Sequence, residues 1–176
     1  MFILGHIGIT IGIFEIARRI PGLSGIPIDL RLVALGAMLP DLIDKPIGHV
    51  IFVDSIGNGR IVAHTLLFCL LLFLTGLYIY SNRQQTYMLV ISAATFLHLL
   101  EDSLWNTPVT LFWPLLGTEF PNKAPHSGFL ELFSSLLMTS YTPAYNQVFI
   151  SEIIGLVCIL LNQNKKLENK RYGKKA

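Results

Sequence analysis

Charged side chains are scarce throughout this sequence. Asp, Glu, Lys and Arg make up 14% of the 176 residues, whereas a soluble domain usually carries about 25%. Cysteine is also rare. Cys69 and Cys158 both lie in apolar stretches, so neither a disulfide framework nor a thiolate metal site is predicted. Because 52% of the chain is hydrophobic, we expect a protein whose solvent is the lipid bilayer.

Apolar stretches long enough to enter a membrane recur along the chain. About 20 helical residues cross a hydrocarbon core. The candidates cover residues 2–20, 30–53, 61–80, 87–105 and 148–161. The second contains Pro40 and Pro46, and proline removes a backbone donor and bends a helix, so a broken or re-entrant element is predicted there. We therefore predict an all-α, polytopic transmembrane bundle over residues 1–163, followed by a basic tail at 164–176.

Basic residues set the predicted orientation. With the N-terminus outside and about five crossings, the cytoplasmic side receives Arg18, Arg19, Arg31, Arg83, Lys165, Lys166, Lys170, Arg171, Lys174 and Lys175. Only Lys45, Arg60 and Lys123 then lie outside, as the positive-inside rule requires. We expect a protein of the cytoplasmic (inner or plasma) membrane with its tail in the cytoplasm. The tail is interpreted as a topology anchor, and no nucleic-acid partner is expected.

The stretch at 106–147 has no apolar segment long enough to cross the bilayer. It is rich in Pro, Trp and Phe, and its apolar piece at 111–117 is short enough to lie in the membrane interface. The sequence leaves open whether this stretch forms a lid, a re-entrant hairpin or an interfacial shelf. It also leaves open whether the outer-loop residues His49, His126 and Glu131 join a site.

Ionisable side chains inside apolar segments are costly and usually have a function. In this sequence they include His6, Asp41, Asp44, His64, His98, Glu101 and Asp102. In the predicted orientation these residues come from four segments and lie near the outer membrane interface. Since the orientation was set by Lys and Arg alone, this shared depth is independent support for one common site. Glu15 lies near the cytoplasmic end of its segment, where it can pair with Arg18 or Arg19.

Two local spacings bring chemically complementary groups together. Residues four apart share a helix face, which joins His98 with Asp102 and Arg60 with His64. Three imidazoles and several carboxylates form a mixed nitrogen and oxygen ligand set, which suits zinc, or Mn or Fe as alternatives. Paired ions can clamp the oxygens of a displacement at phosphorus. The pattern therefore predicts a divalent metal site with hydrolytic chemistry.

Other interpretations explain parts of the same pattern. A single buried histidine is commonly hydrogen-bonded inside a helix bundle, and Asp41 and Asp44 could cap a broken helix. His98 with Asp102 could form a proton relay in a transporter, although no internal repeat of the kind seen in transporters is visible. A non-catalytic membrane protein with a structural metal is the third possibility.

The order of these residues resembles the YdjM-type family of membrane-bound metal-dependent hydrolases. The resemblance covers about residues 1–117 and rests on His6, on residues 36–44 (GAMLPDLID), on 60–66 (RIVAHTL) and on 98–102 (HLLED). The LPD-x-x-D element followed by R-x-x-x-H-T is the most specific part. The resemblance implies an integral membrane hydrolase that depends on a metal.

The sequence is also distantly similar to the zinc-dependent phospholipase C and single-strand nuclease superfamily. That similarity implies that Asp41 (or Asp44), His64 and His98 hold one ion. Asp102 would bridge to a second ion that His6 also binds. The soluble enzymes carry a second H-x-x-x-D for a third ion, for which His126 with Glu131 is a poor substitute. Two ions, with zinc as the first choice, are therefore expected.

The predicted reaction is hydrolysis of a phosphoester on a lipid or lipid-linked substrate at the outer leaflet. The ligands lie where a lipid headgroup resides, so membrane lipids are the expected partners; the oligomeric state is left open. Arg60 is expected to hold a phosphate oxygen through its planar fork of donors. Asp44 or Glu101 is expected to accept the proton of the attacking water.

Overall fold

The computed structural model describes residues 1–52, 57–121, 133–135, 137–138, 141 and 146–172. The helical elements are α1 (Ile3–Ala17), α2 (Leu30–Pro46), the π-helix η1 (Ile47–Ile51), α3 (Leu66–Arg83), α4 (Tyr87–Glu101), the 3-10 turn η2 (Leu104–Asn106), α5 (Pro108–Leu111) and α7 (Gln147–Tyr172). No strand occurs in these residues, so the all-α prediction is confirmed for the described part of the chain. His126, Glu131 and Lys123 lie outside it.

The apolar helices differ in length. Leu66–Arg83 and Gln147–Lys165 are long and apolar enough to cross a membrane, whereas α1 and α4 are apolar but shorter. Most large apolar side chains of α3 are exposed on the surface, including Leu70, Leu74 and Tyr78. Such a surface suits a lipid solvent. Two long and two shorter apolar helices are therefore established in the described part of the chain, while the number of crossings and their orientation remain predictions.

Proline does not break α2, contrary to the prediction. The helix runs through Pro40 and passes directly into η1. Because Pro40 has no N–H, the carbonyl of Gly36, four residues earlier, loses its helical partner. The hydroxyl of Thr95 on α4 donates a hydrogen bond to that carbonyl at 3.1 Å. The neighbouring helix thus satisfies the freed acceptor, and α2 stays continuous.

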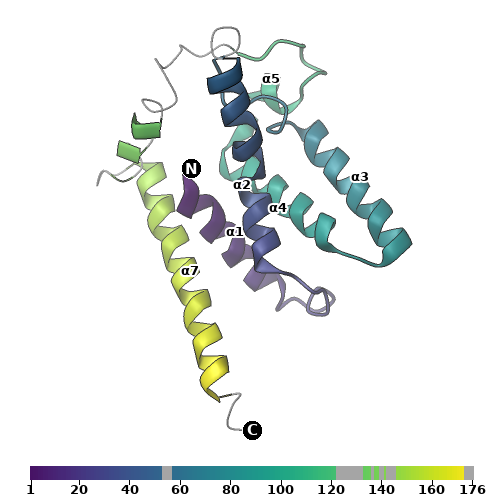
Figure 1. Ribbon diagram of the computed structural model, residues 1–176, viewed down its shortest axis with the longest axis vertical. Coiled ribbons are helices and arrows are strands. Elements are labelled where there is room, and N and C mark those ends of the chain that lie inside the picture. The colour runs from purple at the N-terminus through teal and green to yellow at the C-terminus, as the bar shows by residue number, and fades with distance from the viewer. Residues whose placement is uncertain (53–56, 122–132, 136, 139–140, 142–145, 173–176) are drawn as a thin grey trace.

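α1 packs against α7, which runs in the same direction, and against α2, while α4 packs against α2, again in the same direction, and against α3 (Figure 1). One apolar core joins α1, α2 and α4 through Ile11, Phe14, Val33, Val90 and Ala94. The first turn of α1, the second half of α2, the segment before α3 and the last turn of α4 meet on one side of this core. Thr65 accepts a hydrogen bond from the N–H of Phe68 and so starts α3 directly after His64.

The contact between α1 and α7 is so close that the backbones touch. A Cβ added at Gly155 would overlap the carbonyl oxygen of Leu4, and a Cβ added at Gly8 would overlap the carbonyl of Gly155. Small residues permit this approach, which is a common way to pack helices in membranes. Glycine at these positions therefore holds α7 against α1.

We predict that Gly155→Ala lowers the free energy of unfolding of the detergent-solubilised protein by about 1–3 kcal/mol, because the new methyl group overpacks the α1–α7 contact. Gly25→Ala is the matched control, since a Cβ at Gly25 meets nothing within 4 Å. Thermal unfolding followed by circular dichroism measures both. Equal stability of the two variants would show that the backbones do not approach as closely as described.

Candidate metal centre

Three buried imidazoles converge from three parts of the chain. His6 lies in the first turn of α1, His64 in the segment before α3 and His98 near the end of α4, and each is 0% exposed. The rings of His6 and His98 stack with their centroids 4.0 Å apart. The Nε2 atoms of His64 and His98 lie 3.3 Å apart. The structure thus brings together side chains that the sequence placed at a common depth.

The Nδ1 atom of each imidazole faces an acceptor. The three pairs are His6 with Glu101 (2.8 Å), His64 with Asp44 (2.8 Å) and His98 with the carbonyl of Ala37 (2.6 Å). A carbonyl oxygen only accepts, so Nδ1 of His98 carries the proton, and the two carboxylates favour the same tautomer for the other rings. Each Nε2 atom then presents a lone pair to the space between the rings.

The lone pairs on these Nε2 atoms are not matched by donors from the other rings. With both Nδ1 atoms protonated, the Nε2 atoms of His64 and His98 cannot hydrogen-bond to each other. Among the described residues, Nε2 of His6 is the buried side-chain nitrogen without a hydrogen-bond partner. Metal-binding histidines in proteins have this arrangement, with one nitrogen held by an acceptor and the other directed at the ion. The donor set therefore fits a divalent cation.

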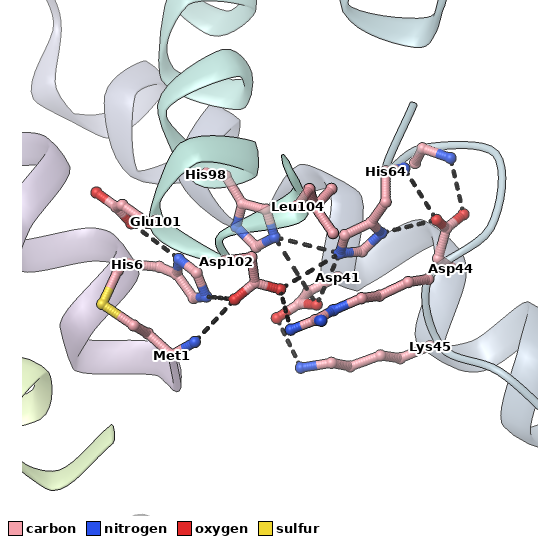
Figure 2. A network of polar contacts seen from close by, with 12 residues as sticks. Met1, His6, Asp41, Asp44, Lys45, His64, His98, Glu101, Asp102 and Leu104 are labelled. Atoms are coloured by element: carbon pink, nitrogen blue, oxygen red, sulfur yellow. Dashed lines mark hydrogen bonds and ion pairs between the residues drawn. The ribbon is translucent and has the colours of Figure 1, made fainter. Parts of the chain in front are cut away.

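Two buried carboxylates, Asp41 and Asp102, border the imidazoles, and both contact rings and cations (Figure 2). Oδ1 of Asp41 lies 3.6 Å from Nε2 of His64 and 4.0 Å from Nε2 of His98, while Oδ2 lies 2.6 Å from Nζ of Lys45. The ion pair with Lys45 fixes the carboxylate so that its other oxygen stays directed at the rings.

Asp102 lies on the other side, and each of its oxygens faces both a ring and a cation. Its Oδ1 lies 3.2 Å from Nε2 of His6 and 2.8 Å from the amine of Met1. Its Oδ2 lies 2.7 Å from a guanidinium nitrogen of Arg60 and 3.9 Å from Nε2 of His64. One oxygen of Asp102 thus faces His6 and the other faces His64, so this carboxylate lies between two groups of ligand atoms.

The ligand atoms form two groups that could each hold a metal ion. One group is Asp41, His64 and His98; the other is His6, His98 and Asp102, and within each group the atoms lie within 4.8 Å of one another. Three protein ligands with room for a further one are typical of catalytic zinc. His98 belongs to both groups, and its single free nitrogen can bind only one ion at a time.

Asp44 and Glu101 lie behind the imidazoles, on the side of Nδ1. Asp44 is 0% exposed and accepts hydrogen bonds from the backbone N–H groups of Ile61, Ala63 and His64 as well as from the His64 ring. Glu101 accepts from the His6 ring and from the hydroxyl of Thr10. Both carboxylates therefore orient an imidazole, and Asp44 also orders the backbone before α3.

The structure also places the remaining predicted residues, and it shows two further residues that the sequence reasoning missed. Arg60 reaches the centre through Asp102, but the predicted helical spacing to His64 is wrong, because α3 begins only at Leu66. His49 lies against Gly59 and belongs to neither ligand group. Sequence reasoning missed Lys45, whose spacing of four from Asp41 could have revealed the pair, and it missed Glu152, an acidic residue inside the last apolar stretch.

We predict that Asp44→Asn weakens zinc binding about 10–100-fold, because it leaves one accepting oxygen, and an NH₂ group, to face the four donors that include Nδ1 of His64. Asp29→Asn is the control, since Asp29 pairs with Arg31 at the exposed start of α2. Competition between the purified protein and a chromophoric chelator for Zn²⁺ gives both affinities. A zinc affinity unchanged by Asp44→Asn would argue against an ion at His64.

Comparison with known proteins places this arrangement in a family. A family model described as YdjM inner membrane protein matches residues 1–167, which include most of α7 and all the predicted site residues. Comparison with curated proteins and with solved structures gives no match. The resemblance seen over residues 1–117 is thus confirmed and extends further along the chain. This protein belongs to the YdjM family of inner membrane proteins.

Proposed function

We propose that this protein is a membrane-bound, metal-dependent hydrolase that cleaves a phosphoester on a lipid or lipid-linked substrate. The observation that carries the proposal is the convergence of three buried Nε2 atoms on the inner oxygens of Asp41 and Asp102. Every Nδ1 atom in this cluster is held by an acceptor. A buried polar cluster built only for packing has no need to direct its lone pairs at one point.

The residues would divide between two ions. Asp41, His64 and His98 would hold one, and His6 with Asp102 the other, since His98 can serve only one of the two groups. Zinc is the first choice for a set of nitrogen and oxygen ligands without thiolates, with Mn and Fe as alternatives. When bound, such ions polarise a phosphoryl oxygen and lower the pKa of water, which makes hydrolysis feasible at neutral pH.

The charges around the centre favour an anionic substrate once the ligand groups are filled. Four carboxylates surround the imidazoles, namely Asp41, Asp44, Glu101 and Asp102, while the side-chain cations are Lys45 and Arg60. Two divalent ions would turn this negative balance positive, and a phosphate group would then be attracted. Arg60, with its side chain 33% exposed, lies where it can donate to a phosphate oxygen from outside.

Asp44 and Glu101 receive a different role in this proposal from the one expected from the sequence. Both oxygens of Asp44 accept hydrogen bonds from fixed donors, and the oxygens of Glu101 are taken by His6 and Thr10. A general base needs an oxygen within reach of the attacking water. We therefore assign both carboxylates to holding His64 and His6 in place rather than to proton transfer.

An apolar groove that begins at Leu66, two residues after His64, supports a lipid substrate. It has a volume of about 650 Å³ and lies between α3, α4 and the segment after α5, with Leu66, Phe96, Leu111 and Phe112 among its lining residues. Leu66 starts α3 close to His64, and with Leu111 it packs against a cluster that contains Leu104. A lipid chain in this groove would bring its headgroup towards the metal ligands.

We predict that the protein purified in detergent contains zinc or another divalent metal, and that His64→Ala and His98→Ala each lose most of it. The substrate is a phospholipid whose headgroup is a terminal phosphate, presented in micelles. Release of inorganic phosphate from it should fall at least about 10³-fold in both variants, because each removes a ligand of the same ion. Elemental analysis and a phosphate assay measure the two quantities.

Glu15→Gln is the control for this experiment, since Glu15 lies at the far end of α1 and pairs with Arg18. It should retain both metal and activity. Near-zero metal in the unchanged protein and in all variants would remove the basis for hydrolysis. Bound metal with zinc flux into liposomes, but without phosphate release, would instead support a transporter.

A further inference from the structure

Glu152 of α7 is an acidic side chain that is 3% exposed in an otherwise apolar part of the helix. Its Oε1 accepts hydrogen bonds from the backbone N–H groups of Phe2 (3.0 Å) and Gly5 (2.8 Å). Its Oε2 accepts from the N–H of Leu4 and from the hydroxyl of Tyr141, both at 3.0 Å. One carboxylate from the end of the chain therefore collects four donors, three of which belong to the start of α1.

These three N–H groups are the ones that a helix cannot satisfy by itself. The first four N–H groups of an α-helix have no partner within it, and they form the positive end of the helix dipole. Such donors are usually capped by the side chain just before the helix, but Phe2 occupies that position in α1 and provides no cap. Glu152 supplies the missing acceptors from α7, which is far from α1 in the sequence but packs directly against it.

The capped turn carries a ligand of the metal centre. His6 follows Gly5 directly, and its own N–H bonds to the carbonyl of Phe2 at 3.1 Å. Its Nε2 faces Oδ1 of Asp102 at 3.2 Å. Any tilt or unwinding of this first turn would move the His6 ring away from Asp102. The contacts of Glu152 go to the backbone and to Tyr141, so its influence on the centre runs through the turn.

Tyr141 strengthens this cap from outside the helix. Burial, the hydrogen bond to Glu152 and the carboxylate charge raise the pKa of Tyr141 to about 12. The phenol therefore stays protonated at neutral pH and donates to Oε2. Removing this hydroxyl leaves the three backbone hydrogen bonds of Glu152 intact, which makes Tyr141→Phe a graded comparison for substitutions of Glu152 itself.

We infer that Glu152 is a positioning residue of the metal centre, which fixes His6 through the first turn of α1 and so controls the ion held by His6 and Asp102. The inference rests on the proposed function and adds α7 to the parts of the chain that build the site. The inference is also selective for one ion, because in the described structure the hydrogen bonds of Glu152 go to the start of α1 and to Tyr141, and not to the elements that carry Asp41 and His64.

The test is a set of zinc titrations on the full-length protein in detergent. Glu152→Gln replaces one accepting oxygen by an NH₂ group that faces the donors. We expect this variant to bind the second zinc ion at least about tenfold more weakly, in the range found for residues that orient metal ligands. The first zinc ion should keep its affinity. Tyr141→Phe should retain both ions.

His6→Ala provides the decisive comparison. It should also lose one ion, and adding Glu152→Gln to it should not change the affinity of the remaining ion, because both substitutions act on the same ligand. If Glu152 only stabilises the fold, the double variant would bind the remaining ion more weakly than His6→Ala alone. Thermal unfolding is recorded in parallel, and Glu152→Asp, which keeps the charge, replaces Glu152→Gln if that variant does not fold.

The outcomes separate this inference from the proposed function. Two zinc ions bound with unchanged affinity by Glu152→Gln would overturn the positioning role and leave the hydrolase proposal standing. Absence of zinc from the unchanged protein would overturn both. Loss of one ion in Glu152→Gln, combined with no further effect in the His6→Ala background, would support the role proposed for Glu152.

Discussion

The structure depends on three buried imidazoles whose Nε2 atoms point towards one another and towards carboxylate oxygens. His64 and His98 bring two such nitrogens to 3.3 Å, and no hydrogen bond between neutral rings in this tautomer can satisfy them. The interior of a membrane helix bundle makes unsatisfied polar groups costly. A cation between the rings would remove that cost, and the surrounding carboxylates would serve as its counter-charges.

The helices support this arrangement by satisfying polar groups across element boundaries. The hydroxyl of Thr95 replaces the N–H that Pro40 lacks, and α2 continues far enough to deliver both Asp41 and Asp44. Asp44 then accepts hydrogen bonds from the backbone before α3 and holds His64. Glu152 does the same for the start of α1. In each case a side chain from one element completes the hydrogen bonds of another, and a candidate ligand is positioned as a result.

The sequence was sufficient to predict which side chains gather at the candidate centre, because their signal is local and chemical. His98 and Asp102 share a helix face, and histidine or aspartate within an apolar stretch stands out from its neighbours. The continuity of α2 was not predictable, because it depends on a hydroxyl supplied by α4. The orienting role of Asp44 was equally hidden, since its donors come from a loop whose path is set by tertiary contacts.

The most direct test of the central claim is X-ray absorption at the zinc edge of protein loaded with Zn²⁺. We expect nitrogen and oxygen ligands at about 2.0–2.2 Å, with the outer-shell scattering of imidazole and no sulfur at about 2.3 Å. Replacing His98 should reduce the imidazole contribution, because this ring lies between both ligand groups. A spectrum of fully hydrated zinc, or one with sulfur ligands from Cys69 or Cys158, would contradict a centre built from histidine and aspartate.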